Sequence, residues 1–265
     1  MKNHSETWHL AWTSDTPFQS LTTAIDFSCF NYFPTPVELT KMASQIVTDF
    51  DYQFVEQIDF AGRYYEQVIY EDRIIPTRLN NWHDFFNACI WMLFPHSKSL
   101  LNQLHISDIT THGLNPRTPA RNRITHFDEC GGVLLYQDET ELALLQEHQW
   151  TRAFYENRAW WGKRLRFINF GHANYEMLLN PFLGLTGKCI PVKANASVME
   201  LESLEMYKCL DTALAEELKS GSWFAKRGNL KPLPLLGIPN WDARNAHPEF
   251  YDNRDYFRPL RSTKE

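Results

Sequence analysis

The sequence predicts a helix-rich α+β protein, folded as one compact domain over residues 1–265 with a small β-sheet, and three observations support this. Several segments space their apolar residues three and four positions apart, as amphipathic helices do. Short runs of β-branched and aromatic residues, bounded by glycine or charged residues, predict a few strands. The chain has 265 residues, of which 43% are hydrophobic and 22% charged, so it can bury a substantial core.

The composition also indicates which classes of partner the protein does not bind and in which cellular compartment we expect it. The net charge of −6 argues against broad binding to nucleic acid or to anionic membranes. The five cysteines are odd in number and form no Cys-x-x-Cys pair, which indicates a reducing compartment. Residues 1–15 are polar, unlike a signal peptide, and the apolar run Phe85–Pro95 is shorter than the ~20 residues of a membrane helix. We therefore expect a cytoplasmic protein that binds neither nucleic acid nor membrane; the sequence does not indicate its oligomeric state.

The N-terminal third begins with an arm and continues into a helix. Residues 1–34 are aromatic but weakly periodic, so we expect an extended arm laid over the body. Thr35–Glu38 forms a capping box with proline at the first helical position, which predicts the start of an amphipathic helix. Residues 53–77 favour strands, with Gln67–Tyr70 pairing with Arg73–Ile75, although their spacing also fits a helix.

The densest apolar stretch is Arg78–His105, and it also carries many polar residues. Asn81 is a good helix N-cap, with Asp84 completing a capping box, and Pro95 marks the end of that helix. One broad face of the helix is apolar, and the flank beside it carries His83, Asn87, Trp91 and Phe94. Such a polar strip can line a pocket when a second element covers it. Alternatively, Asp84 only caps the helix, and His83 and Asn87 bond to buried backbone.

For the middle of the chain, the sequence predicts a short helix, a loop and a hairpin. Ser97 is expected to cap a short second helix. His105–Arg123 is rich in Thr, Asn, Pro and Arg, so we expect a loop. Its arginines (Arg117, Arg121 and Arg123) either clamp an anion or lie in solvent. Ile124–Asp128 and Val133–Gln137 are expected to pair as a hairpin, with Asp128 and Glu129 at the turn. Acidic neighbours argue against Cys130 as a nucleophile, because they raise the pKa of a thiol.

The second half alternates helices and strands before a wrapping tail. The expected elements are helices at Glu139–His148 and Trp150–Asn157, a strand at Arg164–Phe170, a helix at His172–Asn180, a strand at Lys188–Lys193, and a helix from the capping box Ser197–Glu200 to Ser220. Residues 222–265 are too apolar to be disordered, and we expect an irregular, aromatic-rich arm that wraps the body.

His172 and Glu176 lie four positions apart, on one face of a helix that follows a strand and a glycine. Proteins of α/β class often place working groups at this kind of transition. His-x-x-x-Glu can supply two metal ligands, or a general base with the carboxylate that orients it. Alternatively, the pair only stabilises a turn at the surface.

Several residue strings resemble a proteobacterial family catalogued as a domain of unknown function, number 3025. They run from about residue 40 to the end of the chain: Pro76-Thr77-Arg78, the string NWHDFFN from Asn81 to Asn87, Phe94-Pro95, Lys98, Phe127-Asp128-Glu129, Phe170-Gly171-His172-Ala173, and the late PLPLLGIP. The resemblance implies no activity, cofactor or catalytic residue. The family has a polar residue such as Asn after the Asp-Glu pair, where this chain has Cys130, which further disfavours a thiol nucleophile.

Two functional hypotheses follow. The first is a hydrolase that acts on a small anionic substrate with a divalent metal, such as zinc or manganese, or with a His–carboxylate general base. Its candidate catalytic residues are His83, His172, Glu176 and Asp128; its candidate metal ligands are His83, His172 and Glu176; its candidate substrate-binding residues are Arg78, Asn87, Trp91 and Arg121. This hypothesis requires His83 and His172 to converge in space.

The second hypothesis is a non-catalytic module that binds a small ligand or another protein. Trp82, Trp91 and the C-terminal arm would line an aromatic groove, and the pocket would be mostly apolar without convergent titratable groups. The sequence contains no Gly-x-Gly-x-x-Gly, no phosphate-binding Gly-Lys loop and no Gly-x-Ser-x-Gly, so the common nucleotide-binding and serine-hydrolase motifs are absent.

Overall fold

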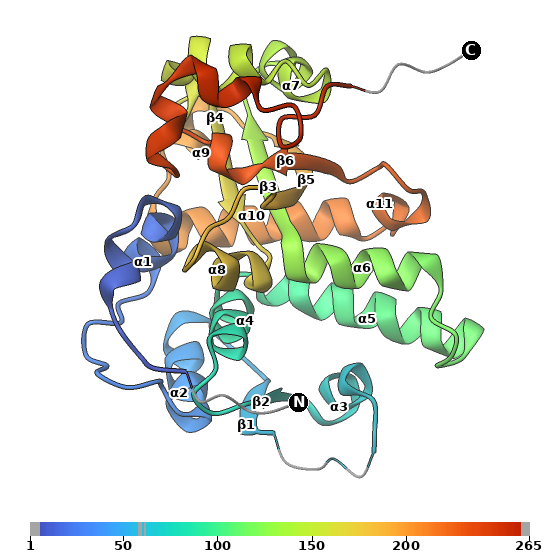
Figure 1. Ribbon diagram of the computed structural model, residues 1–265. Coiled ribbons are helices and arrows are strands. Elements are labelled where there is room, and N and C mark those ends of the chain that lie inside the picture. Colours follow the sequence, from blue (N-terminus) through green and yellow to red (C-terminus); the bar gives the residue numbers. More distant parts are fainter. Residues whose placement is uncertain (1–5, 58–59, 61, 261–265) are drawn as a thin grey trace.

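The computed structural model describes residues 6–57, 60 and 62–260, and it shows a helix-rich α+β fold (Figure 1). The first five residues of the expected N-terminal arm and the last five of the C-terminal arm lie outside the described residues. The helices are α1 (Gln19–Ala24), α2 (Pro36–Ile46), α3 (Tyr65–Asp72), α4 (Trp82–Leu93), α5 (Pro95–His112), α6 (Pro119–Cys130), α7 (Glu139–Gln146), α8 (His172–Leu178), α9 (Ala196–Met199), α10 (Ser203–Leu218) and α11 (Ser222–Ala225). Within the described ranges, none of these helices has the combined length and apolar character that a bilayer crossing requires.

Two small sheets accompany the helices. The strands are β1 (Gln53–Glu56), β2 (Ile74–Thr77), β3 (Gly131–Tyr136), β4 (Leu165–Asn169), β5 (Thr186–Lys193) and β6 (Lys231–Pro234). β1 and β2 pair in parallel, whereas the larger sheet has the order β4-β3-β5-β6. In that sheet β3 is parallel to β5, and the outer strands β4 and β6 are antiparallel to their neighbours. The buried residues Val133, Leu134 and Leu135 place β3 at the centre of the core.

α4 is the most deeply buried helix of the described chain, as the density of its apolar residues predicts. Every residue from Asp84 to Leu93 is buried, and Asn81 caps the helix by accepting a hydrogen bond from the Asp84 main-chain N–H (3.0 Å). The N-terminal arm covers this helix: Trp8 stacks on Trp82 with ring centroids 5.1 Å apart. The arm is therefore packed on the body as predicted, although it also contains the short helix α1.

Between residues 105 and 137, most of the predicted loop and the first hairpin strand are wrong, whereas the second strand, Val133–Gln137, is confirmed as β3. α5 continues to His112, and α6 occupies the stretch expected to be the first hairpin strand. Thr118 caps α6 by accepting from the Arg121 N–H, and Pro119 takes the first helical position. Arg121, Ile124 and Phe127 then fall three residues apart on its buried face. Because this helix reaches Cys130, Asp128 and Glu129 lie in its last turn rather than in a β-turn.

Two other local predictions are corrected. Residues 65–72 form helix α3 rather than a strand, and β2 pairs with β1 instead of with that segment. The helix expected from Ser197 to Ser220 is two helices, α9 and α10, and Asn195 rather than Ser197 caps the first. The capping box at Thr35 is confirmed, with both reciprocal hydrogen bonds present.

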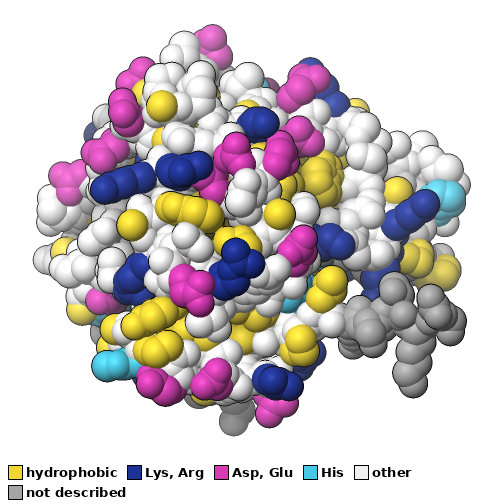
Figure 2. All heavy atoms as spheres, turned by 90° about the horizontal axis from the view of Figure 1, so that it is seen from above, with side chains coloured by type: hydrophobic (Ala, Val, Ile, Leu, Met, Phe, Trp, Pro, Cys, Tyr) yellow, Lys and Arg dark blue, Asp and Glu magenta, His cyan; other side chains and the backbone are white. Residues whose placement is uncertain are grey.

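The C-terminal arm wraps the larger sheet, and part of it is regular. β6 adds a strand to β5, which the prediction of an irregular arm missed. Beyond it, Tyr251 stacks on Phe154, and the buried Asn245 donates to the carbonyls of Leu236 and Ile238. Figure 2, which views the molecule from above Figure 1, shows basic and acidic side chains interspersed with apolar ones over this face.

Candidate functional site

A polar pocket of about 340 Å³ lies where the ends of several elements meet. Residues from the end of β2, from the first turns of α3, α4 and α8, and from the last turn of α6 line it. Figure 1 shows α4, α5, α6 and α8 meeting near the centre of the molecule. The titratable groups that line the pocket are Glu66, Arg78, His83, Asp84, Arg117, Asp128, Glu129 and His172, together with Tyr64 and Tyr65.

His83, in the first turn of α4, is held between two side chains of α8. Its Nδ1 lies 2.8 Å from Glu176 Oε2, and its Nε2 lies 3.0 Å from His172 Nε2. The rings meet edge to face, with centroids 4.4 Å apart. Since Nδ1–H donates to the Glu176 carboxylate, one hydrogen is shared between the two Nε2 atoms. Both histidines line the pocket, but the His83 side chain is 29% exposed and that of His172 only 6%, so His83 is the more accessible of the two.

Gly171, at the start of α8, allows this helix to pack closely against the last turn of α6. A Cβ at this position would lie 2.3 Å from the main-chain oxygen of Glu129 and 2.6 Å from the Cα of Cys130. Both neighbours are backbone atoms that cannot turn away. The glycine that precedes His172 is therefore required by close packing, and it brings His172 beside Asp128.

Asp128 and Lys98 form a buried ion pair beneath the histidines. Lys98 Nζ donates to Asp128 Oδ1 (2.5 Å) and to Asn87 Oδ1 (3.0 Å), and it lies 5.4 Å from the centroid of the Trp91 ring. Burial is the largest single influence and raises the pKa of Asp128, but the charge and hydrogen bond of Lys98, together with the nearby His172 and His105, outweigh it and leave this pKa below its ordinary value. Asp128 is therefore a carboxylate at neutral pH.

His172 is neutral in the folded protein. Burial is the largest influence and lowers its pKa to about 3, although the charge of Asp128 acts in the opposite direction. Asp128 Oδ2 lies 4.0 Å from His172 Nδ1. Because the one hydrogen of the neutral His172 ring lies on Nε2, its buried Nδ1 carries a lone pair, and within the described residues this atom has no hydrogen-bond partner.

Arg78 and Asp84 close one wall of the pocket. Asp84 accepts from Nε (2.9 Å), Nη2 (2.8 Å) and the main-chain N–H (2.6 Å) of Arg78. The Asp84 carboxylate therefore binds Arg78 rather than returning a bond to the helix cap. Asn87 lies beside it and donates to the Tyr65 hydroxyl (3.1 Å).

The structure brings most of the candidate site residues together, including His83 and His172, whose convergence the first hypothesis required. Two candidates lie elsewhere. Trp91 is 1% exposed and packs against Tyr52 beneath Lys98, outside the pocket. Arg121 is fully buried, and its guanidinium donates to the carbonyls of Gly113 and Leu114 at the end of α5.

Arg117 takes the place that was expected for Arg121. It lines the pocket, and its guanidinium donates to the Thr125 hydroxyl. The third arginine of this segment, Arg123, donates to the carbonyls of Phe224 and Ala225 and holds α11. The sequence gives no means to choose among the three, because the choice depends on how α6 is oriented.

The proposed set of three metal ligands is wrong in its geometry. His83 and His172 meet through their Nε2 atoms, whereas Glu176 is bonded to Nδ1 on the other side of the His83 ring. The three donors therefore do not converge on one point. Across residues 6–57, 60 and 62–260, no group of three or more His, Cys, Asp or Glu side chains is arranged to hold a metal ion.

Sequence reasoning missed Lys98 and Glu66 as site residues. Lys98 could have been found, because a lysine four positions after Phe94 and three before Leu101 falls on the buried face of its helix. Glu66 gave no signal, because its segment was assigned to a strand. Cys130 is half-buried, and burial and Glu129 raise the pKa of its thiol to about 11, in agreement with the argument against a thiol nucleophile.

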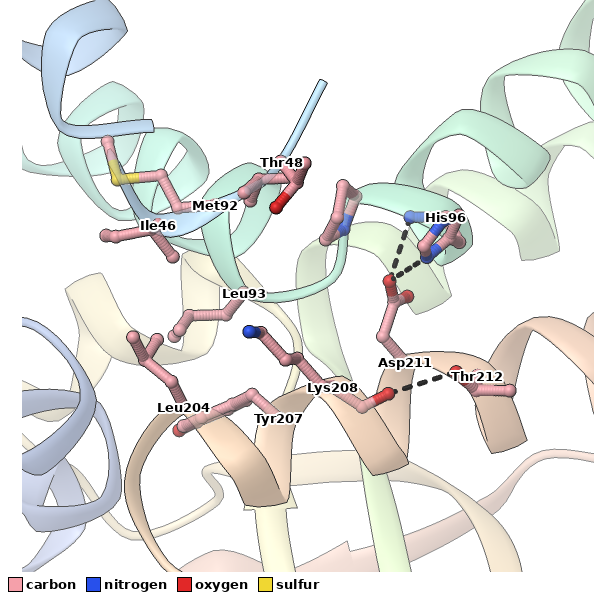
Figure 3. Close-up of a pocket in the computed structure, with 12 residues that line it drawn as sticks. Ile46, Thr48, Met92, Leu93, His96, Leu204, Tyr207, Lys208, Asp211 and Thr212 are labelled. Carbon is pink, nitrogen blue, oxygen red and sulfur yellow. Dashed lines mark hydrogen bonds and ion pairs between the residues drawn. The ribbon is translucent and has the colours of Figure 1, made fainter. Parts of the chain in front are cut away.

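The expected aromatic groove is also wrong. Trp82 is buried against Trp8 and Phe86, and Trp241 of the C-terminal arm packs on Phe167 instead. A separate cavity of about 310 Å³ lies between α2, α4 and α10 (Figure 3). Its wall is mostly apolar, with Lys208 reaching into it.

A family model described as "Protein of unknown function (DUF3025)" matches residues 52–261, which confirms the family that the sequence strings resemble. No curated protein and no solved structure matches the chain. The site must therefore be interpreted from its own chemistry.

Proposed function

Since the chain belongs to the DUF3025 family of proteins of unknown function, we propose from the site alone that it is a hydrolase of a small anionic substrate, with His83 as general base. The observation that carries this proposal is the placement of His83 at the wall of a polar pocket, between Glu176 and His172. A carboxylate on one ring nitrogen and a second ring nitrogen that can accept a proton are what general-base catalysis by histidine needs.

The base works through the tautomer that Glu176 selects. Because Nδ1–H donates to Glu176, the proton taken from water arrives on Nε2 of His83. A water beside His83 replaces the His172 contact at that nitrogen. Glu176 then stabilises the imidazolium that forms, as the carboxylate does in a catalytic triad. His172 stays neutral throughout.

Direct attack by water fits the site better than a covalent intermediate. Within the described residues, the hydrogen-bond partners of His83 are Glu176 and His172, so no serine or cysteine is paired with it. The Cys130 thiol has a raised pKa and is protonated at neutral pH. Burial holds the pKa of Tyr65 well above its usual value, so this hydroxyl is not a nucleophile either.

Arg117 is the group best placed to bind an anion. The charge of Arg78 is matched by two hydrogen bonds to Asp84, whereas Arg117 bonds to the uncharged Thr125. A guanidinium with a free edge can hold a carboxylate or phosphate in the substrate. Carboxyl groups line other parts of this pocket, so we expect the negative group of the substrate to be small and to lie at Arg117.

The proposal is tested by assaying the purified protein against small anionic esters, amides and phosphoesters. We expect His83→Ala to lower kcat/KM by about 100-fold or more, and Glu176→Gln to lower it by about 10-fold or more because the ring loses its orienting carboxylate. His112→Ala is the control, since this histidine is exposed at the end of α5. An unchanged rate in His83→Ala, or no turnover of any member of the panel, contradicts the proposal.

A metal-dependent mechanism is distinguished in the same assay. We expect turnover to survive dialysis against a chelator, because His83 and Glu176 suffice as base and orienting group. Loss of turnover on chelation, with recovery on adding zinc or manganese, would instead make the histidines ligands of a bound cation.

A further inference from the structure

We propose that Glu66 is a second catalytic residue, the general acid that protonates the leaving group while His83 takes a proton from water. This inference rests on the proposed function. Glu66 stands in the first turn of α3, and it lines the same 340 Å³ pocket as His83 although it comes from a different wall. A hydrolytic site gains from two titratable groups with different proton affinities, one to accept a proton and one to supply it.

Glu66 is placed between the pocket and the interior. Its side chain is 17% exposed. Besides the pocket, it lines a cavity of about 10 Å³ with Lys98, His105 and Asp128, which is about the size that one water molecule requires. The carboxyl group is therefore largely shielded from solvent while it remains within reach of a molecule in the pocket.

Asn102 fixes the orientation of Glu66. The Asn102 amide nitrogen donates to Oε2 of Glu66 (2.7 Å) and to its main-chain oxygen (2.9 Å). A single hydrogen bond from a neutral amide does not demand an ionised acceptor, and it leaves Oε1 to carry a proton. The carboxyl group is thus positioned without being paired to a charge.

The neighbouring cations are engaged elsewhere. On α5, Lys98 donates to Asp128. Also on α5, His105 Nε2 lies 3.8 Å from Glu66 Oε1, and burial lowers the pKa of His105 to about 4, so it is neutral at pH 7. Arg117, in the segment before α6, bonds to Thr125.

The remaining neighbours favour the protonated acid. Asp128 of α6 faces Glu66 as a carboxylate, and a second negative charge nearby opposes ionisation. Tyr65, the neighbour on α3, is neutral. Burial, helped by the Asp128 charge, raises the pKa of Glu66 to about 7, although the Asn102 hydrogen bond and the charges of Lys98 and Arg117 act in the opposite direction. A large share of Glu66 therefore carries a proton at neutral pH.

The water oxygen forms a bond to the electrophilic centre of the substrate, and the water proton passes to Nε2 of His83. The bond to the leaving oxygen or nitrogen breaks, and the electron pair released to that atom accepts the proton of Glu66. The products are those of hydrolysis, with His83 protonated and Glu66 ionised. Transfer of the extra proton from His83 to Glu66 through solvent restores the site.

The first test measures the proton directly, by carboxyl ¹³C NMR of protein labelled at glutamate. Glu66→Gln identifies the signal, and Glu71→Gln is the control because that side chain is 53% exposed on the same helix. We expect the Glu66 signal to titrate at about 7. A midpoint below about 5.5 would overturn the proposal, since few molecules would then carry a proton at neutral pH.

The second test compares two substrates that differ in the leaving group. A nitrophenolate leaves without help, whereas an alkoxide needs a proton. We expect Glu66→Gln to lower kcat by about 100-fold on the alkyl substrate and by less than about 3-fold on the nitrophenyl substrate. His83→Ala should lower both. Equal losses on both substrates in Glu66→Gln would make Glu66 a structural residue and overturn the inference.

The two tests separate the inference from the proposed function. Normal turnover in His83→Ala contradicts the proposed function, and therefore also the proposal that Glu66 is its general acid. If His83→Ala loses turnover while Glu66→Gln lowers kcat equally on both substrates, the proposed function stands and only the role of Glu66 as general acid is contradicted. Circular dichroism verifies that Glu66→Gln folds; should it not fold, Glu66→Asp replaces it, because a shortened acid also loses selectively on the alkyl substrate.

Discussion

His83 and His172 stand 89 positions apart in the chain and share one hydrogen between Nε2 atoms that lie 3.0 Å apart. This contact joins the first turn of α4 to the first turn of α8. Glu176 holds the other nitrogen of His83, and Asp128 faces the other nitrogen of His172. The pair is thus bracketed by two carboxylates.

The neutral state of His172 makes stability depend on pH. Its pKa is about 3 in the folded protein and 6.5 when unfolded, so the unfolded chain binds the extra proton as pH falls below 6.5. We expect this residue to remove roughly 3 kcal/mol from the free energy of unfolding between pH 6.5 and pH 4. Urea unfolding of His172→Gln should show a shallower loss over this range, whereas His112→Gln, at an exposed site, should follow the native protein. Identical slopes in all three proteins would contradict the prediction.

Removal of Lys98 leaves the Asp128 carboxylate buried without its partner. We expect Lys98→Met to lower the free energy of unfolding by about 3–5 kcal/mol, and the double change with Asp128→Asn to recover part of this loss. Lys219→Met should change it by less than about 0.5 kcal/mol, because Lys219 and Glu216 pair at an exposed site. Chemical denaturation measures all three. A loss no larger in Lys98→Met than in Lys219→Met would show that the buried pair is not needed.

Gly171→Ala tests the close approach of α8 to α6. The new Cβ would meet backbone atoms at 2.3 and 2.6 Å, so the helices must separate. We expect a loss of about 3 kcal/mol in thermal or urea unfolding. Gly187→Ala is the comparison, since its nearest neighbours are side-chain atoms of Leu235 and Phe167 at 3.1 Å, which can move. A smaller cost at Gly171 than at Gly187 would be inconsistent with the packing described.

Asp211 of α10 caps α5 from a neighbouring helix (Figure 3). Its carboxylate accepts from the main-chain N–H groups of His96 (2.9 Å) and Ser97 (2.8 Å), and it is 1% exposed. We expect Asp211→Ala to lower the free energy of unfolding by about 2–3 kcal/mol, because two main-chain N–H groups, that of Ser97 buried, lose their acceptor. Thr212→Ala, which removes a bond within α10, should cost less than about 0.5 kcal/mol. Calorimetry of both variants decides the point.

The thiols should differ in reactivity. Cys29 is exposed, whereas the half-buried Cys130 has a pKa of about 11 and is almost entirely protonated at pH 8. We expect iodoacetamide at pH 8 to modify Cys29 at least about tenfold faster, because the thiolate is the reactive form. Mass spectrometry of tryptic peptides measures both rates, with denatured protein as the reference. Faster modification of Cys130 would show that its environment favours the thiolate.

The sequence correctly located features that depend on near neighbours. The Thr35 capping box, the Asn81 cap and the Gly171 turn into α8 all formed as predicted. Where local signals conflicted, the predictions failed: the Cys130-Gly131-Gly132 stretch looked like a hairpin turn, but Thr118 and the buried face of α6 made it a helix end. The segment is helical because one of its faces packs against the core, and which face is buried is set only by the tertiary structure.

By itself, the sequence determined the helix-rich α+β class and the family, and it pointed to several of the residues that line the polar pocket, because capping, periodicity and distinctive strings are local properties. Tertiary structure alone decided which residues meet. It placed His83 against His172, chose Arg117 over Arg121, and brought Glu66 to the pocket through α3. Such contacts depend on the angles at which helices pack, and those angles follow from the whole core rather than from any one segment.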